Sequence, residues 1–484
     1  MSISRQNVET ARKTGQEFRS GAVPISEHIE KTISGIQKEE PRNHCFVTLF
    51  EEQAHKAAIR VAQKLRSKED CSLLAGVPVG VDDTMMTRGR RTTCGSGTLE
   101  HFIPTFSATA VQKLEDAGMI IVGKLNTDEF SMGSLTQTSF FGPTSHPADE
   151  TRVAGAAAAA VASGVISCAL ASDTGGALRQ ASAGCGVCGI RPTYGAVSRL
   201  GLAAFASSMD QIGPIASDIR DCAEILNIIS GKDPCDSTSV EIDKIDLSRI
   251  DSFSLSGLRI GIPSVFFESD TDPFVKASFH EALDALRSEG AVTETFSLKG
   301  LDQAVAAYAV ISCAEASANL SRIDGIKYGF RAPEAKTLSE VYERTRSVGF
   351  GSDAQKRIML GNYFLSAERY EEYYLRALRV KALIAKGFAS AFRRYDVILS
   401  PVSPSLAPKK EPYDTLSMFE EDFFTVPASL AGLPAASVPC GKNPDGLSVG
   451  LQMIGPHFSE AKIVGAADAF LRIGGGQKTQ GGQK

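Results

Sequence analysis

The sequence lacks a hydrophobic run long enough to cross a membrane. Its longest apolar stretch, residues 156–171, is short for a membrane span, consists mostly of alanine and is interrupted by Gly164. Residues 1–18 also lack the apolar core of a signal peptide. We therefore expect a buried helix followed by a buried strand at residues 156–171. We also expect a cytoplasmic protein, or one in an organelle matrix if a targeting segment has been removed.

Blocks of like charge are also missing, since no run of five or six acidic or basic residues occurs. The net charge of −5 argues against a generally basic surface for nucleic acid, which needs clustered lysine and arginine. We find no direct nucleic-acid motif, although a partner could still carry the nucleic acid.

The ten cysteines do not form the dense pattern of a disulfide framework. Only Cys185 and Cys188 lie close together, and no second pair stands at zinc-ligand spacing. The pattern predicts isolated, reduced thiols, and a redox or metal role for this pair is the less favoured interpretation. We expect no metal and no cofactor.

What the sequence does contain is the alternation of strands and helices that is typical of an α/β protein. At 484 residues, with 43% hydrophobic and 22% charged residues, the chain can bury a sizeable core. We predict N-terminal helices over residues 1–70, with Ser26 as an N-cap, one domain over residues 71–470, and a flexible tail over residues 471–484. Asp272 and Pro273 predict the start of a helix that reaches about Ser288. Further helices are expected at residues 51–65, 109–117 and 367–392, and strands at residues 73–81, 119–122, 165–171, 258–263 and 396–401.

Eight segments between residues 76 and 456 resemble, in order, the amidase-signature family, and within it the A subunits of glutamyl-tRNA(Gln) amidotransferases. The densest part is the signature region, residues 76–214. The eight segments are GVPVGVDDT (76–84), GKLNTDEFSMG (123–133), DTGG (173–176), RPTYG (191–195), FASSMDQIGP (205–214), RIMLG (357–361), FTVPASLAGLP (424–434) and VGLQMIGP (449–456).

The resemblance implies one α/β/α fold with a central mixed β-sheet covered by helices, and amide hydrolysis by a Ser–Ser–Lys triad. In that mechanism a lysine activates a bridging serine, which activates the nucleophilic serine, and backbone N–H groups hold the oxyanion. The lysine position is Asp82 in this sequence, and the nucleophile position is Ala177. The bridging-serine loop is shortened by about four residues after Gly155, and the next serine, Ser163, is expected inside a helix. The oxyanion turn keeps its residues, Thr174, Gly175 and Gly176.

The resemblance also places three residues that would hold an amino acid: Tyr308, Arg357 and Asp422. An arginine suits an α-carboxylate, and an acid suits an α-ammonium. The competing interpretation is a buried ion pair kept for packing. Ala309 stands where relatives often have a second tyrosine, which alters the expected shape of the pocket.

Replacement nucleophiles are poorly supported. Ser172 and Ser182 flank the turn without an evident base, and Cys185 would need a cation such as Arg179 to stabilise its thiolate. The histidines His101 and His146 pair with no serine or cysteine in the sequence.

We therefore predict a catalytically inactive member of the family that serves as a scaffold or interaction subunit of a protein complex. Its partners would be B- or C-like amidotransferase subunits, or another assembly. Two alternatives stay open: an active amidase or amidotransferase subunit that uses displaced residues, and a non-catalytic amino-acid sensor.

Overall fold

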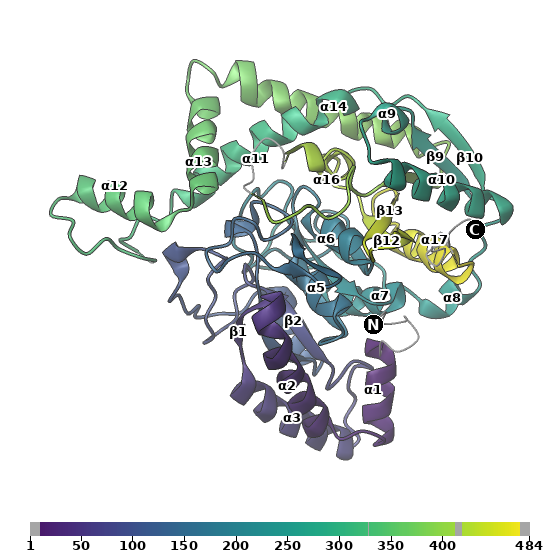
Figure 1. The fold of residues 1–484 in the computed structure, drawn as a ribbon, viewed down its shortest axis with the longest axis horizontal. Helices are drawn as coiled ribbons and strands as arrows, with labels where there is room; N and C mark the ends of the chain where they lie inside the picture. The colour runs from purple at the N-terminus through teal and green to yellow at the C-terminus, as the bar shows by residue number, and fades with distance from the viewer. Residues whose placement is uncertain (1–9, 328, 412–418, 475–484) are drawn as a thin grey trace.

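A twisted sheet of 11 strands runs through the middle of the molecule (Figure 1). The computed structural model describes residues 10–327, 329–411 and 419–474. The strand order is β1-β3-β2-β6-β8-β7-β12-β13-β11-β9-β10, and β4 and β5 form a separate pair. The strands are β1 (Phe46–Leu49), β2 (Pro78–Asp82), β3 (Ile120–Leu125), β4 (Ser145–His146), β5 (Asp149–Val153), β6 (Cys168–Asp173), β7 (Cys188–Arg191), β8 (Gln211–Ala216), β9 (Arg259–Pro263), β10 (Val292–Phe296), β11 (Val397–Pro401), β12 (Ala435–Lys442) and β13 (Ser448–Ile454).

The sheet is mixed, as the sequence predicts. Strand β2 pairs in parallel with β3 and β6, and β9 pairs in parallel with β10 and β11. The strands between these two groups are antiparallel: β6 with β8, β8 with β7, and β7 with β12. The ends of β2 and β6 therefore meet at the same edge, which brings Asp82 and the turn after Asp173 together.

Helices cover both faces of the sheet and complete the predicted α/β/α arrangement. Successive residues of strand β11 belong to the two hydrophobic clusters on opposite faces of the sheet. Val397 and Leu399 belong to one cluster and Ile398 belongs to the other. The first cluster includes α10 and α17, and the second includes α11, α14 and α16. The helices are α1 (Ala11–Ser20), α2 (Ile25–Asn43), α3 (Glu51–Arg66), α4 (Thr109–Asp116), α5 (Ala156–Ala162), α6 (Ala177–Cys185), α7 (Ile219–Ile229), α8 (Leu247–Asp251), α9 (Val265–Glu268), α10 (Pro273–Ser288), α11 (Ala304–Leu320), α12 (Leu338–Gly349), α13 (Ser352–Leu365), α14 (Arg376–Ala391), α16 (Val426–Leu430) and α17 (Glu460–Arg472).

The N-terminal helices α1 to α3 lie at the bottom of the view, and α12 projects at the left (Figure 1). The prediction that residues 1–70 are helical is wrong at Phe46–Leu49, because this segment is strand β1 and pairs with β3. Its four residues are too few to show a clear strand period in the sequence. The first 70 residues thus form part of the sheet as well as covering it.

Several predicted helix ends can be compared with the structure. Helix α10 begins as expected, with the Phe274 N–H donating to Asp272 Oδ1 at 2.7 Å. Ser26 is not an N-cap, because α2 already begins at Ile25 after Pro24. Ser163 is the C-cap of α5 and lies just outside the helix. The segment predicted as one helix over residues 367–392 contains a π-helical turn, Glu371–Leu375, before α14.

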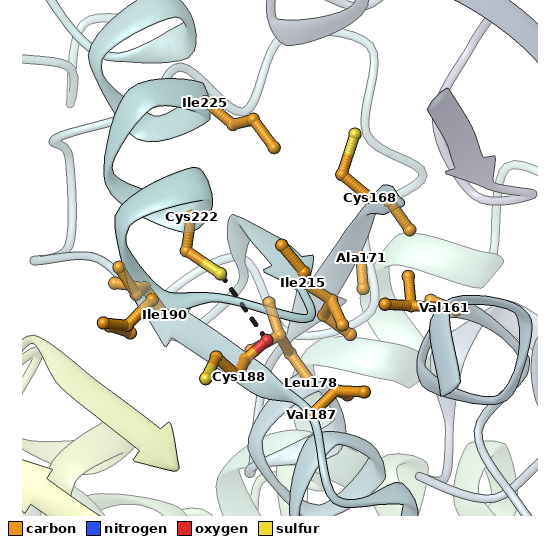
Figure 2. Close-up of a cluster of buried hydrophobic side chains, with 14 of the residues drawn as sticks. Val161, Cys168, Ala171, Leu178, Val187, Cys188, Ile190, Ile215, Cys222 and Ile225 are labelled. Atoms are coloured by element: carbon orange, nitrogen blue, oxygen red, sulfur yellow. Dashed lines mark hydrogen bonds between the residues drawn. The ribbon is translucent and has the colours of Figure 1, made fainter. Parts of the chain in front are cut away.

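The ten cysteines, all of them among the described residues, are thiols outside any disulfide, as predicted. Figure 2 shows Cys168, Cys188 and Cys222 in the core between β6, β7 and α7, where the Cys222 thiol contacts the Cys188 carbonyl oxygen at 3.5 Å. Cys188 is therefore a buried packing residue rather than one half of a redox pair with Cys185.

No helix among the described residues is long and apolar enough to cross a membrane. The predicted flexible tail falls largely on residues 475–484, which lie outside the described residues, while α17 continues to Arg472.

Candidate functional site

The turn that follows β6 consists of Thr174, Gly175 and Gly176, and α6 begins at the next residue, Ala177. Gly176 has a φ of 152°, which L residues rarely adopt. A Cβ at this position would also overlap the side chain of Thr425. The tight turn therefore requires glycine at this position.

The side chains around the turn hold it from two sides. A Cβ on Gly175 would lie 2.5 Å from the Tyr308 hydroxyl oxygen, so the tyrosine packs directly on the glycine backbone. The Thr174 hydroxyl donates to Asp210 Oδ1 at 2.7 Å. The first N–H groups of α6 follow immediately, and the N-terminus of a helix favours negative charge. The turn thus keeps the form expected of an oxyanion site.

Three fully buried charged residues next to this turn, Asp173, Arg179 and Arg191, form an ion cluster. Asp173 accepts two hydrogen bonds of 2.9 Å from Arg179 and one of 2.7 Å from Arg191. Burial alone would raise the pKa of Asp173, but the two guanidinium groups lower it to about 2. Arg179 also donates to the Gln452 side chain at 2.5 Å, so its donors are committed to the cluster.

Asp82 occupies the end of β2 and is only 6% exposed. Its Oδ1 accepts from the Thr84 N–H and hydroxyl, both at 3.0 Å. Its Oδ2 accepts from the Ser172 N–H at 3.3 Å and the Ser172 hydroxyl at 3.0 Å. All four donors are neutral, so none of them offsets the negative charge of the carboxylate.

The next residue, Asp83, is paired with a buried lysine. Lys124 Nζ lies 3.8 Å from Asp83 Oδ1 and donates to the Met85 carbonyl oxygen. Burial raises the pKa of Asp83 and lowers that of Lys124, because each charged form loses its solvent. Lys124 thus lies closest to Asp83, and it also attracts the Asp82 carboxylate.

Asp82 and Ala177 line one cavity. At this point the cavity contains a carboxylate where the resemblance places an amine, and a methyl group where it places a hydroxyl. The shortened segment after Gly155 reaches the same cavity through Ala156 and Ala157. Helix α5 therefore adds only methyl groups where the bridging serine would lie.

Sequence reasoning missed a chain of hydroxyl groups in this cavity. Ser131 Oγ lies 2.9 Å from Ser172 Oγ, which donates to Asp82. Ser131 falls within a recognised segment, but its neighbours in space come from two other strands, which the sequence does not reveal.

The three residues predicted to hold an amino acid line a second pocket together with the oxyanion turn. Arg357 donates to Asp353 Oδ2 at 2.7 Å and its guanidinium lies 4.7 Å from the centre of the Phe419 ring. Asp422 Oδ1 accepts from the Gln180 amide at 2.6 Å, and burial raises the pKa of Asp422 to about 7. Gln180 had no predicted role, and only its place one turn after Ala177 on α6 could have indicated one.

The other nucleophile candidates are not supported. Burial raises the pKa of Cys185 to about 12, and Arg179 is held by Asp173. The His146 Nε2 lies 3.1 Å from the Gly184 carbonyl oxygen, and burial lowers the pKa of His146. The Ser182 hydroxyl donates to the carbonyl oxygen one turn earlier in α6, at 2.8 Å.

Comparison with known proteins agrees with this architecture. The amidase family profile matches residues 27–464. The chain belongs to the amidase family. The A subunit of the glutamyl-tRNA(Gln) amidotransferase of Agathobacter rectalis is 48% identical over 95% of this chain and 93% of that protein. The corresponding A subunit of Lachnospira eligens is 45% identical over 96% of this chain and 98% of that protein.

Solved structures of the amidase family share the fold. The crystal structure of the glutamyl-tRNA(Gln) amidotransferase A subunit from Thermotoga maritima has a TM-score of 0.76 at 36% identity, covering 96% of this chain and 94% of that one. A bacterial aryl acylamidase of the amidase-signature family has a TM-score of 0.84 at 21% identity, covering 97% of each chain, and supports the fold alone. Within this amidase fold, the turn and the pocket lie together, and Asp82 and Ala177 line the adjoining cavity.

Proposed function

We propose that this protein is a catalytically silent relative of the amidotransferase A subunits and serves as an interaction subunit of a protein complex. The observation that carries the proposal is the cavity shared by Asp82 and Ala177. A methyl group has no lone pair with which to attack an amide, and α5 supplies no bridging hydroxyl. Loss of one key member of a serine triad costs a factor of roughly 10⁶ in turnover, and here all three are absent.

The hydroxyl chain from Ser131 through Ser172 to Asp82 is the strongest support for the rival function, an amidase with displaced residues. If the Ser172 hydroxyl donates to Asp82, Ser131 would donate to Ser172, in the order of a relay. A carboxylate is a much weaker base than the neutral amine it replaces, and a general base works best with a pKa near the working pH. The Asp82 carboxylate also already accepts four hydrogen bonds, which leaves it little capacity to take a proton.

The interaction role is supported by the exposed apolar side chains at the projecting end of the molecule. Val348 on α12 and Met359 on α13 are each 71% exposed, with Leu338 and Tyr363 nearby in the same two helices. Exposed apolar and aromatic side chains of this kind are typical of protein interfaces. The relatives are named as A subunits, so B- or C-like subunits are the partners we propose first, and an unrelated assembly is the alternative.

Amino-acid binding is a second candidate function, supported by Tyr308, Arg357 and Asp422 in one pocket. A buried arginine and a buried acid at the two sides of a pocket suit the carboxylate and the ammonium of an α-amino acid. Binding without cleavage would make the protein a sensor or a ligand-stabilised component of a complex.

Two measurements test the primary proposal. Purified protein incubated with glutamine should release no ammonia above the buffer blank, and Ser131→Ala should behave identically. Ammonia release that scales with protein concentration and is lost in Ser131→Ala would establish the rival function. Affinity purification from the native source should recover a stoichiometric partner chain, and a monomer without partners would contradict the interaction role.

A further inference from the structure

The amino-acid pocket and the cavity at Asp82 are continuous. Both are lined by Ser131, Gly133, Ser134 and Ala177. Arg357 and Asp422 line only the first of them, and Asp82 lines only the second. A ligand held by its α-carboxylate and α-ammonium would therefore extend past Ala177 and end near Asp82.

The residues lining the Asp82 cavity carry negative charge without a positive counterpart. Asp82 and Asp128 are its two ionisable residues, and no lysine, arginine or histidine is among the described residues that line it. The Asp128 carboxylate accepts four hydrogen bonds from its own loop, from Leu135, Thr136 and Thr138. Lys124 does not line the cavity, and its Nζ lies 3.8 Å from Asp83, although it also attracts Asp82 through space.

A buried carboxylate that forms no ion pair of its own among the described residues favours a cationic ligand. The neutral donors from Thr84 and Ser172 orient Asp82 but leave its charge uncompensated. A primary ammonium group brings a positive charge toward Asp82 and three N–H donors, which match the hydroxyl oxygens of Ser131 and Ser172. A side-chain amide such as that of glutamine is neutral and would not offset the negative charge of the Asp82 carboxylate.

Ala177 fits the middle of such a ligand. Its methyl group lies at the junction of the pocket and the cavity, where aliphatic carbons of a side chain would pass. In ornithine the terminal nitrogen is as many bonds from Cα as in glutamine, and in lysine it is one bond further. Both would bring an ammonium group to the region beyond Ala177.

We infer that the pocket selects basic α-amino acids, such as lysine or ornithine, and that Asp82 is the residue that determines this specificity. The inference rests on the proposed amino-acid binding at Arg357 and Asp422. It also assigns a role to the reversal of charge at Asp82, which abolishes the chemistry of the family at that position.

Isothermal titration calorimetry on the full chain tests this inference. Lysine, ornithine, glutamine, norleucine and Nε-acetyl-lysine are titrated in turn. We expect lysine or ornithine to bind at least about tenfold more tightly than the three uncharged side chains, the lower range for a buried charge pair. Asp82→Asn should remove this preference, so that lysine, ornithine and norleucine bind with similar affinity. Asp396→Asn is the matched control, because it makes the same change of charge at a surface acid paired with Arg259.

The outcomes separate the two proposals. Glutamine or Nε-acetyl-lysine binding as tightly as lysine, or a preference that persists in Asp82→Asn, overturns the role of Asp82 but not amino-acid binding. No binding by any of the five, with Arg357→Ala behaving like the unaltered chain, overturns both. If Asp82→Asn fails to fold, the series of five ligands decides the question by itself.

Discussion

The turn before α6 and the cavity at the end of β2 lie side by side, yet their charges are arranged in opposite ways. Behind the turn, Asp173 is matched by Arg179 and Arg191, and burial of all three is compensated within the protein. In the cavity, Asp82 meets only neutral donors. The first arrangement holds β6, β7 and α6 together, so its loss would damage the fold.

The largest effect should follow from breaking the ion cluster. Arg179→Ala would remove two hydrogen bonds from the buried Asp173 carboxylate and the donor to Gln452, and we expect a loss of about 3–5 kcal/mol in the free energy of unfolding. Urea denaturation followed by circular dichroism measures it. Arg259→Ala is the control, because its pair with Asp396 is half exposed and should contribute less than about 1 kcal/mol. Equal losses in the two variants would refute this account of the cluster.

The same variant has a defined pH dependence. The pKa of Asp173 is lowered to about 2 in the folded protein, so its ionised form stabilises the fold above the unfolded pKa near 4. This contribution is lost as the pH falls toward 2. The destabilisation by Arg179→Ala should therefore be about 1 kcal/mol smaller at pH 3 than at pH 7. A penalty that stays constant or grows in acid would contradict the pairing.

A smaller loss of stability is expected at the turn itself. Gly176→Ala combines an unfavourable φ of 152° with overlap on Thr425, and should cost about 2–4 kcal/mol. Gly89→Ala is the matched control, since Gly89 also has a positive φ, of 69°, but nothing within 4 Å of its Cβ position. We expect it to cost about 1 kcal/mol, from backbone strain alone. Thermal and urea unfolding of both variants would measure the difference, and equal losses would mean that overlap with Thr425 contributes nothing.

Binding of an amino acid should depend on pH through Asp422. Its pKa is raised to about 7 by burial, and only the ionised carboxylate attracts an α-ammonium. Affinity should therefore rise about tenfold from pH 6 to pH 8, as the ionised fraction of Asp422 rises. Calorimetry across this range measures the change, and Asp422→Asn should bind weakly with no such dependence. A higher affinity at pH 6 than at pH 8 would place the ammonium elsewhere.

No gain of activity is expected from restoring the nucleophile. Ala177→Ser returns a hydroxyl beside the oxyanion turn but supplies neither a base nor the bridging serine, and adding Asp82→Lys leaves the bridge missing. Ammonia release from glutamine should stay at the blank in both variants. Activity in Ala177→Ser alone would mean that the Ser131 and Ser172 hydroxyls can take over the bridge.

The resemblance to the family allowed the turn and the three pocket residues to be named, and in the structure they line one pocket. The altered triad positions remain a prediction from the same resemblance. Helix-capping preferences predicted a helix start correctly where a single residue determines it, as at Asp272 before α10. Local sequence patterns failed at β1, where pairing with β3 outweighs the helical pattern around it. They also missed the contact of Ser131 with Ser172, which depends on how β2, β6 and the loop after β3 come together in space.

The strand order also has a consequence for how the chain is made. Strand β7 lies between β8 and β12, and Ile190 pairs with Ala436, about half the chain length away. At a synthesis rate of about 5–20 residues per second, one edge of β7 waits roughly 10 to 50 s for its neighbour to leave the ribosome. During this interval the unpaired edge is a template for other chains. Correct folding therefore requires that this edge of β7 does not pair with another chain before β12 has been synthesised.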